Sequence, residues 1–568
     1  MLLWLIMAFL THFILICTSA LGLSIALPND FFPLGIPLGG FLCLAPYFYA
    51  LKTADSWKKG AAMGFVFGIV FHSTSSWWLA NFKDYAFWTL GATSLFYGFF
   101  FGFWGIFLQY AKNYSKSTPG RQKIPRFFSG PFLTALIWTV MEWQKSNGYF
   151  AFPWGLLPYT VYNCLPLIQI ADITGVYGLS FLLALSSAVI AEIPWIRPKN
   201  KKITTEFHGE NRDKPKRQNG FLTSCFSVVK YSYSVKSIFA VLAILALFLV
   251  YGCIRLAHPV PAQRTIPLIL VQHNIDQYYY EEEALTRAVS LSRQGLEAMR
   301  EQGKEPAMII WSETVLTLPY KGNRFFRSQN AIPFFYESDI PILTGAPLII
   351  EEGQNEDSTD IYNGAILVQR GSVISGYAKQ QLIPFAESIP FGSQPWMRRF
   401  MDKFVGFSSG WATGKEAVIM EIQGLSFGTP ICFEDAFARL CRNFTAAGAE
   451  VLINLTNDSW SQSVSAEVQH LAAARFRSVE NRRPLVRSTN SGCTVYIDAE
   501  GRIRSSLPLF TADYLILDLP VQTGGPTVYF LFGDWFPVLC GILALLWFIY
   551  QSLGLNPSGI SIFTVSPD

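Results

Sequence analysis

Three side chains in the second half of the sequence have the types that nucleophilic catalysis requires. Cys432, in GTPICFEDAF, offers a thiol, Glu313, in WSETV, offers a carboxylate, and Lys379, in YAKQQ, offers an ammonium group. A cysteine attacks as its thiolate, a nearby carboxylate can take the thiol proton, and a fixed cation stabilises a tetrahedral oxyanion. Because cysteine is among the residues most often buried in protein cores, a packed core thiol is the alternative for Cys432.

A cysteine–histidine pair is the competing catalytic arrangement. His470, in the helical segment EVQHLAAARFR, is the plausible histidine partner for Cys432. A histidine in such a helix more often packs or caps, and the sequence does not clearly place an Asn or Asp to orient it. The sequence therefore favours Glu313 as the base.

The three candidate residues fall in a stretch, residues 258–528, that alternates strand-like and helix-like segments. The predicted strands are 266–272, 307–311, 340–346, 362–369, 417–422, 425–432, 450–456, 484–489 and 493–498, and the predicted helices include 282–301 and 464–482. This alternation predicts a layered α/β domain with sheets buried on both faces. Polar residues end several of these strands, at Glu313, at Cys432 and at Asn457-Asp458, where α/β sheets tend to hold their ligands.

The remainder of the chain has the composition of a membrane protein. Hydrophobic residues make up 51% of the sequence and charged residues 15%, against about 25% charged residues in soluble domains. Eight apolar segments approach the length that crosses a bilayer, at residues 2–26, 33–51, 60–81, 87–111, 131–149, 167–194, 237–256 and 530–552. The sequence therefore predicts a bundle of about eight transmembrane helices that carries one large domain. The predicted parts are a seven-helix bundle at 1–257, the α/β domain at 258–528, and a last transmembrane helix with a cytoplasmic tail at 529–568.

Basic loop residues predict the orientation of this bundle. Clusters of Lys and Arg follow the second, fourth and sixth segments, at 52–59, 112–126 and 197–217. Cytoplasmic loops carry such excesses, so the N-terminus is expected in the cytoplasm and the large domain on the opposite face. The net charge of +4 then reflects membrane topology, and a nucleic-acid partner is not expected.

The nine cysteines do not form a pattern typical of disulfides or zinc. Only Cys432, Cys441 and Cys493 lie in the α/β stretch, and neither a CxxC motif nor a His/Cys cluster has zinc-ligand spacing. We therefore expect no metal and no cofactor.

Two sets of motifs carry a family resemblance. WSETVLTLP, YAKQQLIPFAE and ICFED resemble the Glu–Lys–Cys set of the nitrilase (carbon-nitrogen hydrolase) superfamily. EWQKSNGYFAFPWG, QIADITGVYGLSFL, TNDSW and QHLAAARFRSVENRRPLVRSTNSG resemble the apolipoprotein N-acyltransferase family, over about residues 30–550. The resemblance implies an αββα sandwich that faces the periplasm on a bundle in the bacterial inner membrane.

The resemblance also implies an activity. The family moves an acyl chain from a phospholipid to the α-amino group of a diacylglyceryl-modified N-terminal cysteine, which completes lipoprotein maturation. The implied partners are a phospholipid donor, a diacylated apolipoprotein acceptor and the membrane, and we expect a monomer. Cys432 would form a thioester in a ping-pong reaction, with Glu313 as the general base and Lys379 as the oxyanion partner.

The resemblance extends to supporting residues and also shows departures. The supporting residues that match family motifs are Glu387, Glu434, Trp311, Asn363 (or its neighbour Tyr362), Phe433 and Trp460. The departures are Gln144 and Lys145 for the usual Leu and Arg, Ala386 and His273 for the usual Gly, and Ser461-Gln462 for Phe-Gly. The last departure bears on the acyl pocket, not on Glu313, Lys379 or Cys432.

Three other functions remain as alternatives. A membrane-tethered amidase or nitrilase would use the same three residues with water as acceptor, although eight segments exceed what a tether requires. A non-catalytic lipid-binding homologue would be expected to lose part of the Glu–Lys–Cys set. A transporter would carry ionisable residues in the middle of its membrane segments, where Glu142 is the main candidate.

Overall fold

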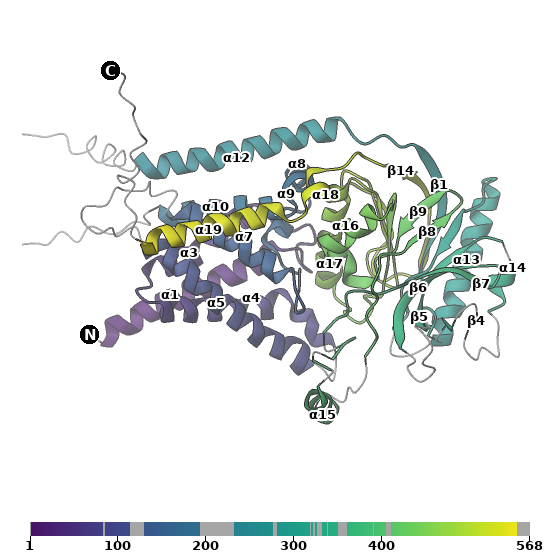
Figure 1. Ribbon diagram of the computed structural model, residues 1–568, viewed down its shortest axis with the longest axis horizontal. Helices are drawn as coiled ribbons and strands as arrows, with labels where there is room; N and C mark the ends of the chain where they lie inside the picture. The colour runs from purple at the N-terminus through teal and green to yellow at the C-terminus, as the bar shows by residue number, and fades with distance from the viewer. Residues whose placement is uncertain are drawn as a thin grey trace, which may run out of the picture.

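The computed structural model describes a helical bundle with an α/β domain at one end (Figure 1). The residues that it describes are 2–82, 86–113, 130–193, 232–276, 281–317, 320–321, 324–325, 332–337, 339–349, 360–384, 386–389, 391–392, 394–404 and 410–553. The predicted loop 197–217 and the C-terminal tail lie outside these residues. Both described chain ends lie at the end of the bundle that is far from the α/β domain.

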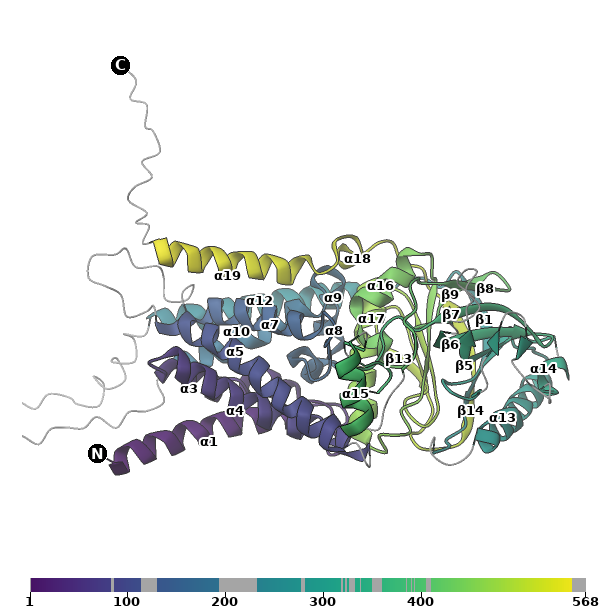
Figure 2. The same ribbon diagram turned by 60° about the horizontal axis from the view of Figure 1, so that its bottom comes forward.

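The bundle consists of helices that run side by side in both views (Figures 1 and 2). Its long helices are α1 (Leu2–Ala26), α4 (Trp57–Ser75), α5 (Thr93–Asn113), α7 (Pro131–Lys145), α10 (Tyr177–Glu192), α12 (Ser232–Ala257) and α19 (Trp535–Leu553). Shorter helices are α2 (Pro37–Leu42), α3 (Ala45–Thr53), η1 (Trp77–Asn81), η3 (Phe87–Ala92), η4 (Leu157–Val161), α8 (Leu165–Ile168), α9 (Ala171–Thr174) and α18 (Val528–Phe532).

Four of the described helical segments are long and apolar enough to cross a membrane. They are 9–26, 87–111, 236–257 and 535–552, and a fifth crossing would combine 165–174 with 177–192, which meet at 118°. The other three predicted segments contain shorter or less apolar helices. The segment 33–51 divides into α2 and α3, α4 begins with Trp57-Lys58-Lys59, and α7 has only 15 residues.

Two of the basic residues used for orientation are described at the far end of the bundle. Lys52 lies at the end of α3 and forms an ion pair with Glu192, the last residue of α10. Lys59, at the start of α4, forms an ion pair with Asp55 2.7 Å away. This end of the bundle is opposite the α/β domain (Figure 1).

The α/β domain contains two sheets. One has eight strands, in the order β14-β1-β2-β5-β3-β4, with β6 paired to β5 and β7 paired to β6. Its strands are β1 (Arg264–Gln272), β2 (Met308–Ile310), β3 (Tyr320–Lys321), β4 (Arg324–Phe325), β5 (Ile342–Ile349), β6 (Ile361–Gln369), β7 (Ser372–Ala378) and β14 (Asp513–Val521). The other has six strands, in the order β13-β12-β11-β10-β9-β8. Its strands are β8 (Ile419–Ile422), β9 (Leu425–Gly428), β10 (Val451–Thr456), β11 (Leu485–Thr489), β12 (Val495–Ile497) and β13 (Ile503–Ser506).

Both sheets are mixed, because each combines parallel and antiparallel pairs. β1 pairs in parallel with β2 and antiparallel with β14, and β11 pairs in parallel with β10 and antiparallel with β12. The nine predicted strands all match described strands, whereas β3, β4, β7, β13 and β14 were not predicted. β13 is exposed or half-buried along its length, and β14 is so over its first four residues, so both lack the continuous apolar run of the buried strands.

Helices cover the two sheets on their outer sides (Figure 1). The eight-stranded sheet carries α13 (Glu281–Glu301) and α14 (Phe334–Glu337) on the side away from the bundle. The six-stranded sheet carries α16 (Ala438–Ala446) and α17 (Val464–Asn481) between itself and the bundle, and η6 (Cys432–Ala436) follows β9. The amphipathic helix α15 (Pro395–Phe404) lies apart from the sheets, near the end of the bundle.

Candidate active site

Glu313 lies just after β2 and is held by groups from both sheets. Asn363 of β6 donates its side-chain amide to Glu313 Oε1 at 2.8 Å, and the Asn457 backbone N–H donates to Oε2 at 3.0 Å. The carboxylate is 4% exposed. Burial raises the pKa of Glu313; Lys379 opposes the shift and Glu387 adds to it. A carboxyl group with a raised pKa is a stronger proton acceptor, as a general base requires.

Lys379 directly follows β7 and lies between two carboxylates. Its ammonium group is 2.7 Å from Glu387 Oε1 and 3.4 Å from Glu313 Oε1, and its side chain is fully buried. Burial alone lowers the pKa of Lys379, but Glu313 and Glu387 outweigh this and raise it well above its usual value. Lys379 therefore remains a cation. Asn363 also donates to Glu387 Oε1, at 3.0 Å, so one amide joins both carboxylates.

Cys432 begins the turn η6, with a φ of +52° that non-glycine residues rarely adopt. The side-chain amide of Asn454, from the interior of β10, donates to the carbonyl oxygens of Pro430 and Cys432, at 3.0 and 2.8 Å. Burial raises the pKa of the Cys432 thiol well above its usual value; Glu313 raises it further and Lys379 opposes the shift. The resting group is therefore a thiol, close enough to Glu313 and Lys379 for their charges to act on it.

Glu434, two residues beyond Cys432, lies behind the nucleophile turn. Its carboxylate accepts hydrogen bonds from the backbone N–H groups of Gln380, Gln381 and Ile431, at 2.7 to 2.9 Å, and from the Tyr377 hydroxyl. Burial raises the pKa of Glu434 to about 7. These bonds tie the turn that carries Cys432 to the loop that carries Lys379, so Glu434 is a structural partner of the site.

Of the three predicted aromatic residues, the structure places Phe433 beside Lys379 and Trp460 against aromatic residues of the bundle. The Phe433 ring centre is 5.6 Å from the Lys379 ammonium group. Trp460 stacks on Phe82 of the bundle, with ring centres 4.1 Å apart, and contacts Trp78. Trp311 lies elsewhere: its indole is buried against Phe334 and donates to Ser292 of α13. β2 ends at Ile310 and the chain turns at Glu313, so the two-residue alternation that would put Trp311 and Glu313 on one face does not continue, and Trp311 faces the outer helices.

The departures from the family motifs have separate environments. His273 is buried, with its Nδ1 3.4 Å from the Ser312 hydroxyl, and Ala386 is exposed in the loop after β7. The buried Ser461 donates to Glu467 at 3.0 Å. Gln462 is exposed, with a φ of +42°, so Ser461 and Gln462 differ in burial although they are adjacent.

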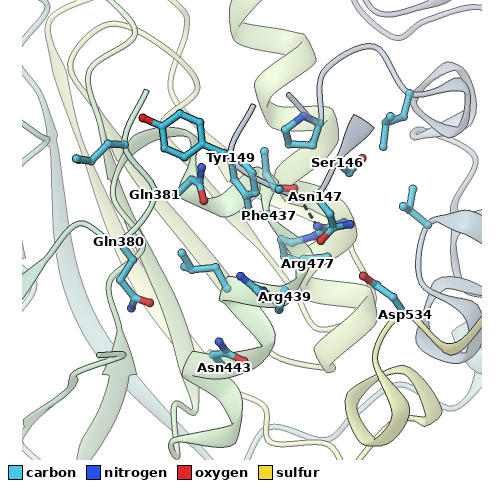
Figure 3. Close-up of a pocket in the computed structure, with 18 of the residues that line it drawn as sticks. Ser146, Asn147, Tyr149, Gln380, Gln381, Phe437, Arg439, Asn443, Arg477 and Asp534 are labelled. Atoms are coloured by element: carbon cyan, nitrogen blue, oxygen red, sulfur yellow. Dashed lines mark hydrogen bonds between the residues drawn. The ribbon is translucent and has the colours of Figure 1, made fainter. Parts of the chain in front are cut away.

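A polar cavity of about 440 Å³ lies where the bundle meets the α/β domain (Figure 3). Its lining includes Ser146 and Tyr149 after α7, Gln380 and Gln381 after Lys379, Phe437, Arg439 and Asn443 near α16, and Arg477 and Asp534. Cys432 and Glu313 are not among the described residues that line it. The cavity thus lies beside the turn that follows Cys432, outside the group of catalytic candidates.

Sequence reasoning missed two groups that hold the candidates in place, and it named a third, Asn457, only as a polar residue at a strand end. Asn454 and Asn457 fix Cys432 and Glu313, and Tyr377 supports Glu434. A signal was present for Asn454, since a lone amide interrupts the apolar strand VLINLT. His470 proved not to face Cys432, because its two ring nitrogens contact Asp458 and Asp435.

Comparisons with known proteins agree with this arrangement. The model of the apolipoprotein N-acyltransferase N-terminal domain matches residues 19–189, and that of the carbon-nitrogen hydrolases matches residues 336–529. Apolipoprotein N-acyltransferase 2 of Treponema denticola is 36% identical, over 95% of this chain and 97% of its own length. The Borreliella burgdorferi apolipoprotein N-acyltransferase is 28% identical, over 92% of both chains.

Among solved structures, Saccharomyces cerevisiae Nit3, a member of the nitrilase superfamily, matches with a TM-score of 0.33 and 17% identity, over 46% of this chain and 92% of its own. The relationship rests on the sequence relatives, which match nearly the whole chain. The chain therefore belongs to the apolipoprotein N-acyltransferase family, within the nitrilase superfamily, and acts as an apolipoprotein N-acyltransferase in lipoprotein maturation.

Proposed function

We propose that Glu313, Lys379 and Cys432 carry out the acyl transfer through a thioester. The carrying observation is the buried group formed by Glu313, Asn363, Lys379 and Glu387 beside Cys432, since it supplies a base and a cation to one thiol. Glu387 accepts hydrogen bonds from Lys379 and Asn363 and so holds both side chains in place, and Glu434 supports the turn. Phe433 and Trp460 border the substrates.

In the first half-reaction, Cys432 Sγ attacks the ester carbonyl carbon of a phospholipid while Glu313 takes the thiol proton. Lys379 stabilises the oxyanion of the tetrahedral intermediate. The ester C–O bond breaks as Glu313 returns the proton to the leaving oxygen. A lysophospholipid departs, and the acyl chain stays on Cys432 as a thioester.

In the second half-reaction, the α-amino group of the diacylglyceryl-modified cysteine attacks the thioester carbon. Glu313 takes a proton from the attacking nitrogen, and Lys379 again stabilises the oxyanion. The C–S bond breaks, the thiol of Cys432 regains a proton, and the product is an amide. One site serves both substrates in turn, so the reaction is ping-pong.

The proposed architecture is an αββα sandwich at 258–528 on a bundle of eight crossings, seven within 1–257 and the last within 529–568. Helices α1, α3, α4, α5, α7, α10, α12 and α19 run along the bundle (Figures 1 and 2), in support of a multi-pass bundle. Lys52 and Lys59 at the far end support a cytoplasmic N-terminus, with the sandwich facing the periplasm of the inner membrane. All proposed site residues come from one chain, so a monomer suffices.

The test is the intact mass of the purified protein after incubation with a phospholipid, with Cys432→Ser as the matched variant. We expect an acyl adduct, removed by hydroxylamine, on the wild type alone. A diacylated lipopeptide should then discharge the adduct and gain one acyl chain. An adduct on Cys432→Ser, or transfer activity in that variant, would refute the assignment of the nucleophile.

The same experiment separates transfer from hydrolysis. A membrane-tethered hydrolase would lose the adduct to water at the same rate with and without the lipopeptide. We expect instead that the adduct persists until the lipopeptide is added, because a buried thioester is protected from water.

A further inference from the structure

A buried charged bridge lies behind the nucleophile turn, formed by Asp435, Asp458, His470 and Arg487. His470 Nε2 is 2.8 Å from Asp435 Oδ1, and His470 Nδ1 is 2.9 Å from Asp458 Oδ2. Arg487 of β11 contacts the second oxygen of Asp435 and lies 3.7 Å from Asp458 Oδ2. His470, at the middle of α17, is 1% exposed, and the other three are at most 5% exposed.

The charges of the bridge balance when His470 is an imidazolium. Each ring nitrogen contacts a carboxylate oxygen, and only the doubly protonated ring donates from both nitrogens. Burial and Arg487 lower the pKa of His470, but Asp458 and Asp435 outweigh them and raise it. The two cations and two carboxylates then sum to zero, whereas a neutral ring would leave an unpaired negative charge in the protein interior.

The two ends of the bridge belong to the two halves of the candidate site. Asp435 lies in η6, three residues after Cys432. Asp458 directly follows Asn457, whose backbone N–H donates to Glu313 Oε2 at 3.0 Å. The Thr456 hydroxyl also donates to Asp458, at 3.3 Å. His470 therefore joins the turn that carries the thiol to the loop that holds the carboxylate.

We propose that His470 is a positioning residue, which through Asp435 and Asp458 holds the Cys432 turn at a fixed distance from the Glu313 loop. The proposal rests on the proposed roles of Cys432 and Glu313. His470 does not contact the substrates in this role. It acts through the two aspartates, and its effect on the reaction is geometric, because acyl transfer is sensitive to small displacements of the nucleophile from its base.

Two neighbouring side chains, Glu467 and Trp154, complete the surroundings of the bridge. Glu467, one turn before His470, accepts from the Ser461 hydroxyl at 3.0 Å, and burial raises its pKa well above its usual value. A protonated Glu467 adds no charge to the bridge. Trp154 of the bundle lies against the imidazole, with ring centres 5.0 Å apart, and closes it from the membrane side.

The experiment compares His470→Gln with Arg475→Gln, a matched control on the same helix. Arg475 is also buried, but it bonds the Gly501 carbonyl and Asn163, away from η6. The measurements are the rate of Cys432 acylation at saturating phospholipid, the KM for phospholipid, the rate of thiol alkylation by iodoacetamide, and the melting temperature. We expect His470→Gln to lower the acylation rate about 10- to 100-fold with little change in KM. Its alkylation rate should change as well.

Arg475→Gln should lower the melting temperature without changing either rate at a temperature where both variants are folded. Equal rates in His470→Gln and wild type would overturn the proposal, as would equal rate losses in both variants. If His470→Gln does not fold, Asp435→Asn serves the same test, because it keeps the side-chain shape and weakens one end of the bridge. Cys432→Ser distinguishes the failures: an active Cys432→Ser refutes the proposed function, whereas an inactive Cys432→Ser beside a normal His470→Gln refutes only the positioning role.

Discussion

The two long helices of the α/β domain cover equivalent layers but have opposite environments. α13 lies over the eight-stranded sheet with one face exposed, and its Arg293, 58% exposed, pairs with Glu337. α17 lies over the six-stranded sheet and is buried along its whole length from Ser465 to Asn481. One helix is a cover that faces water, whereas the other is an internal layer between the sheet and the membrane bundle.

The polar residues of α17 show what this burial is used for. Gln469 donates to the carbonyl oxygens of Pro28 and Ser75 in the bundle, at 3.0 and 3.1 Å, and Glu480 accepts from the Val176 N–H at 3.1 Å. On the other side, Arg477 donates to the carbonyl oxygen of Ala436, in the turn of Cys432. The same helix thus contacts both the bundle and the nucleophile turn, so the catalytic domain packs directly against the bundle.

The largest expected effect concerns the buried helix α17. Arg477→Gln removes the cation beside Glu480, 3.0 Å away, and leaves a buried carboxylate unpaired. We expect the free energy of unfolding to fall by about 3 to 5 kcal/mol. Thermal unfolding in detergent would measure this, and a loss below about 1 kcal/mol would mean that α17 is less tightly packed than the contacts indicate.

Lys379→Ala should lower the reaction rate, and because it removes a buried cation from between Glu313 and Glu387 it should also lower the melting temperature. It removes the ammonium group that we assign to the oxyanion, and we expect the acylation rate to fall about 10²- to 10³-fold, or about 2.7 to 4 kcal/mol of barrier. Single-turnover acylation of Cys432 measures it. A loss below about tenfold would exclude the oxyanion role for Lys379.

Glu480→Gln tests the contact between α17 and the bundle through pH. Burial raises the pKa of Glu480 to about 7 from an ordinary value of 4.5, so the folded state binds a proton that the unfolded state has released. Stability should therefore fall as the pH rises from about 4.5 to 7, by up to about 3 kcal/mol from this group. Melting temperatures across this range should decline less in Glu480→Gln than in the wild type, and identical slopes would contradict the assignment.

Asn363→Ala removes the amide shared by Glu313 and Glu387. Hydrogen bonds to charged groups contribute about 1.5 to 3 kcal/mol, so we expect acylation to slow about 10- to 100-fold. Asn363→Asp would place a third carboxylate in the group and should be slower still. Restored activity in Asn363→Asp would argue against a donor role for this side chain.

The smallest effect belongs to the exposed helix. Arg293→Gln removes the ion pair between Arg293 of α13 and Glu337 of α14, where solvent screens both charges. We expect a change in unfolding free energy within about 0.5 kcal/mol and normal acylation. A loss as large as that of Arg477→Gln would remove the contrast between the two helices.

The sequence predicted the buried strands well, for a physical reason, and the roles of Glu313, Lys379 and Cys432 stay predictions. Strands β1 and β2 are largely buried apolar runs, and Glu313, after β2, meets Asn457, after β10, near the ends of the two strands. The confirmed family resemblance then narrows the expected reaction to acyl transfer. In the structure, Glu313 and Lys379 form one group of hydrogen bonds and ion pairs with Asn363 and Glu387, and separate sequence motifs do not show such contacts.

Other features depended on contacts between distant segments, which local patterns do not contain. Trp311 and Glu313 are two residues apart and would share a face if β2 continued, but the strand ends at Ile310 and the chain turns, so the alternation did not decide which side chain faces the site. His470 appeared as a lone histidine on a helix, because its partners Asp435 and Asp458 come from two other elements. Several bundle segments are short or bent, since helices inside a bundle can contact each other in place of lipid.

The left-handed backbone at Cys432 has a consequence for how this protein can change. A side chain at a φ of +52° is held there by its surroundings at a cost of about 1 to 3 kcal/mol, and glycine would occupy the same conformation without that cost. Loss-of-function substitutions at this position can therefore be more stable than the active protein. Selection for stability alone would therefore not favour a thiol at this position.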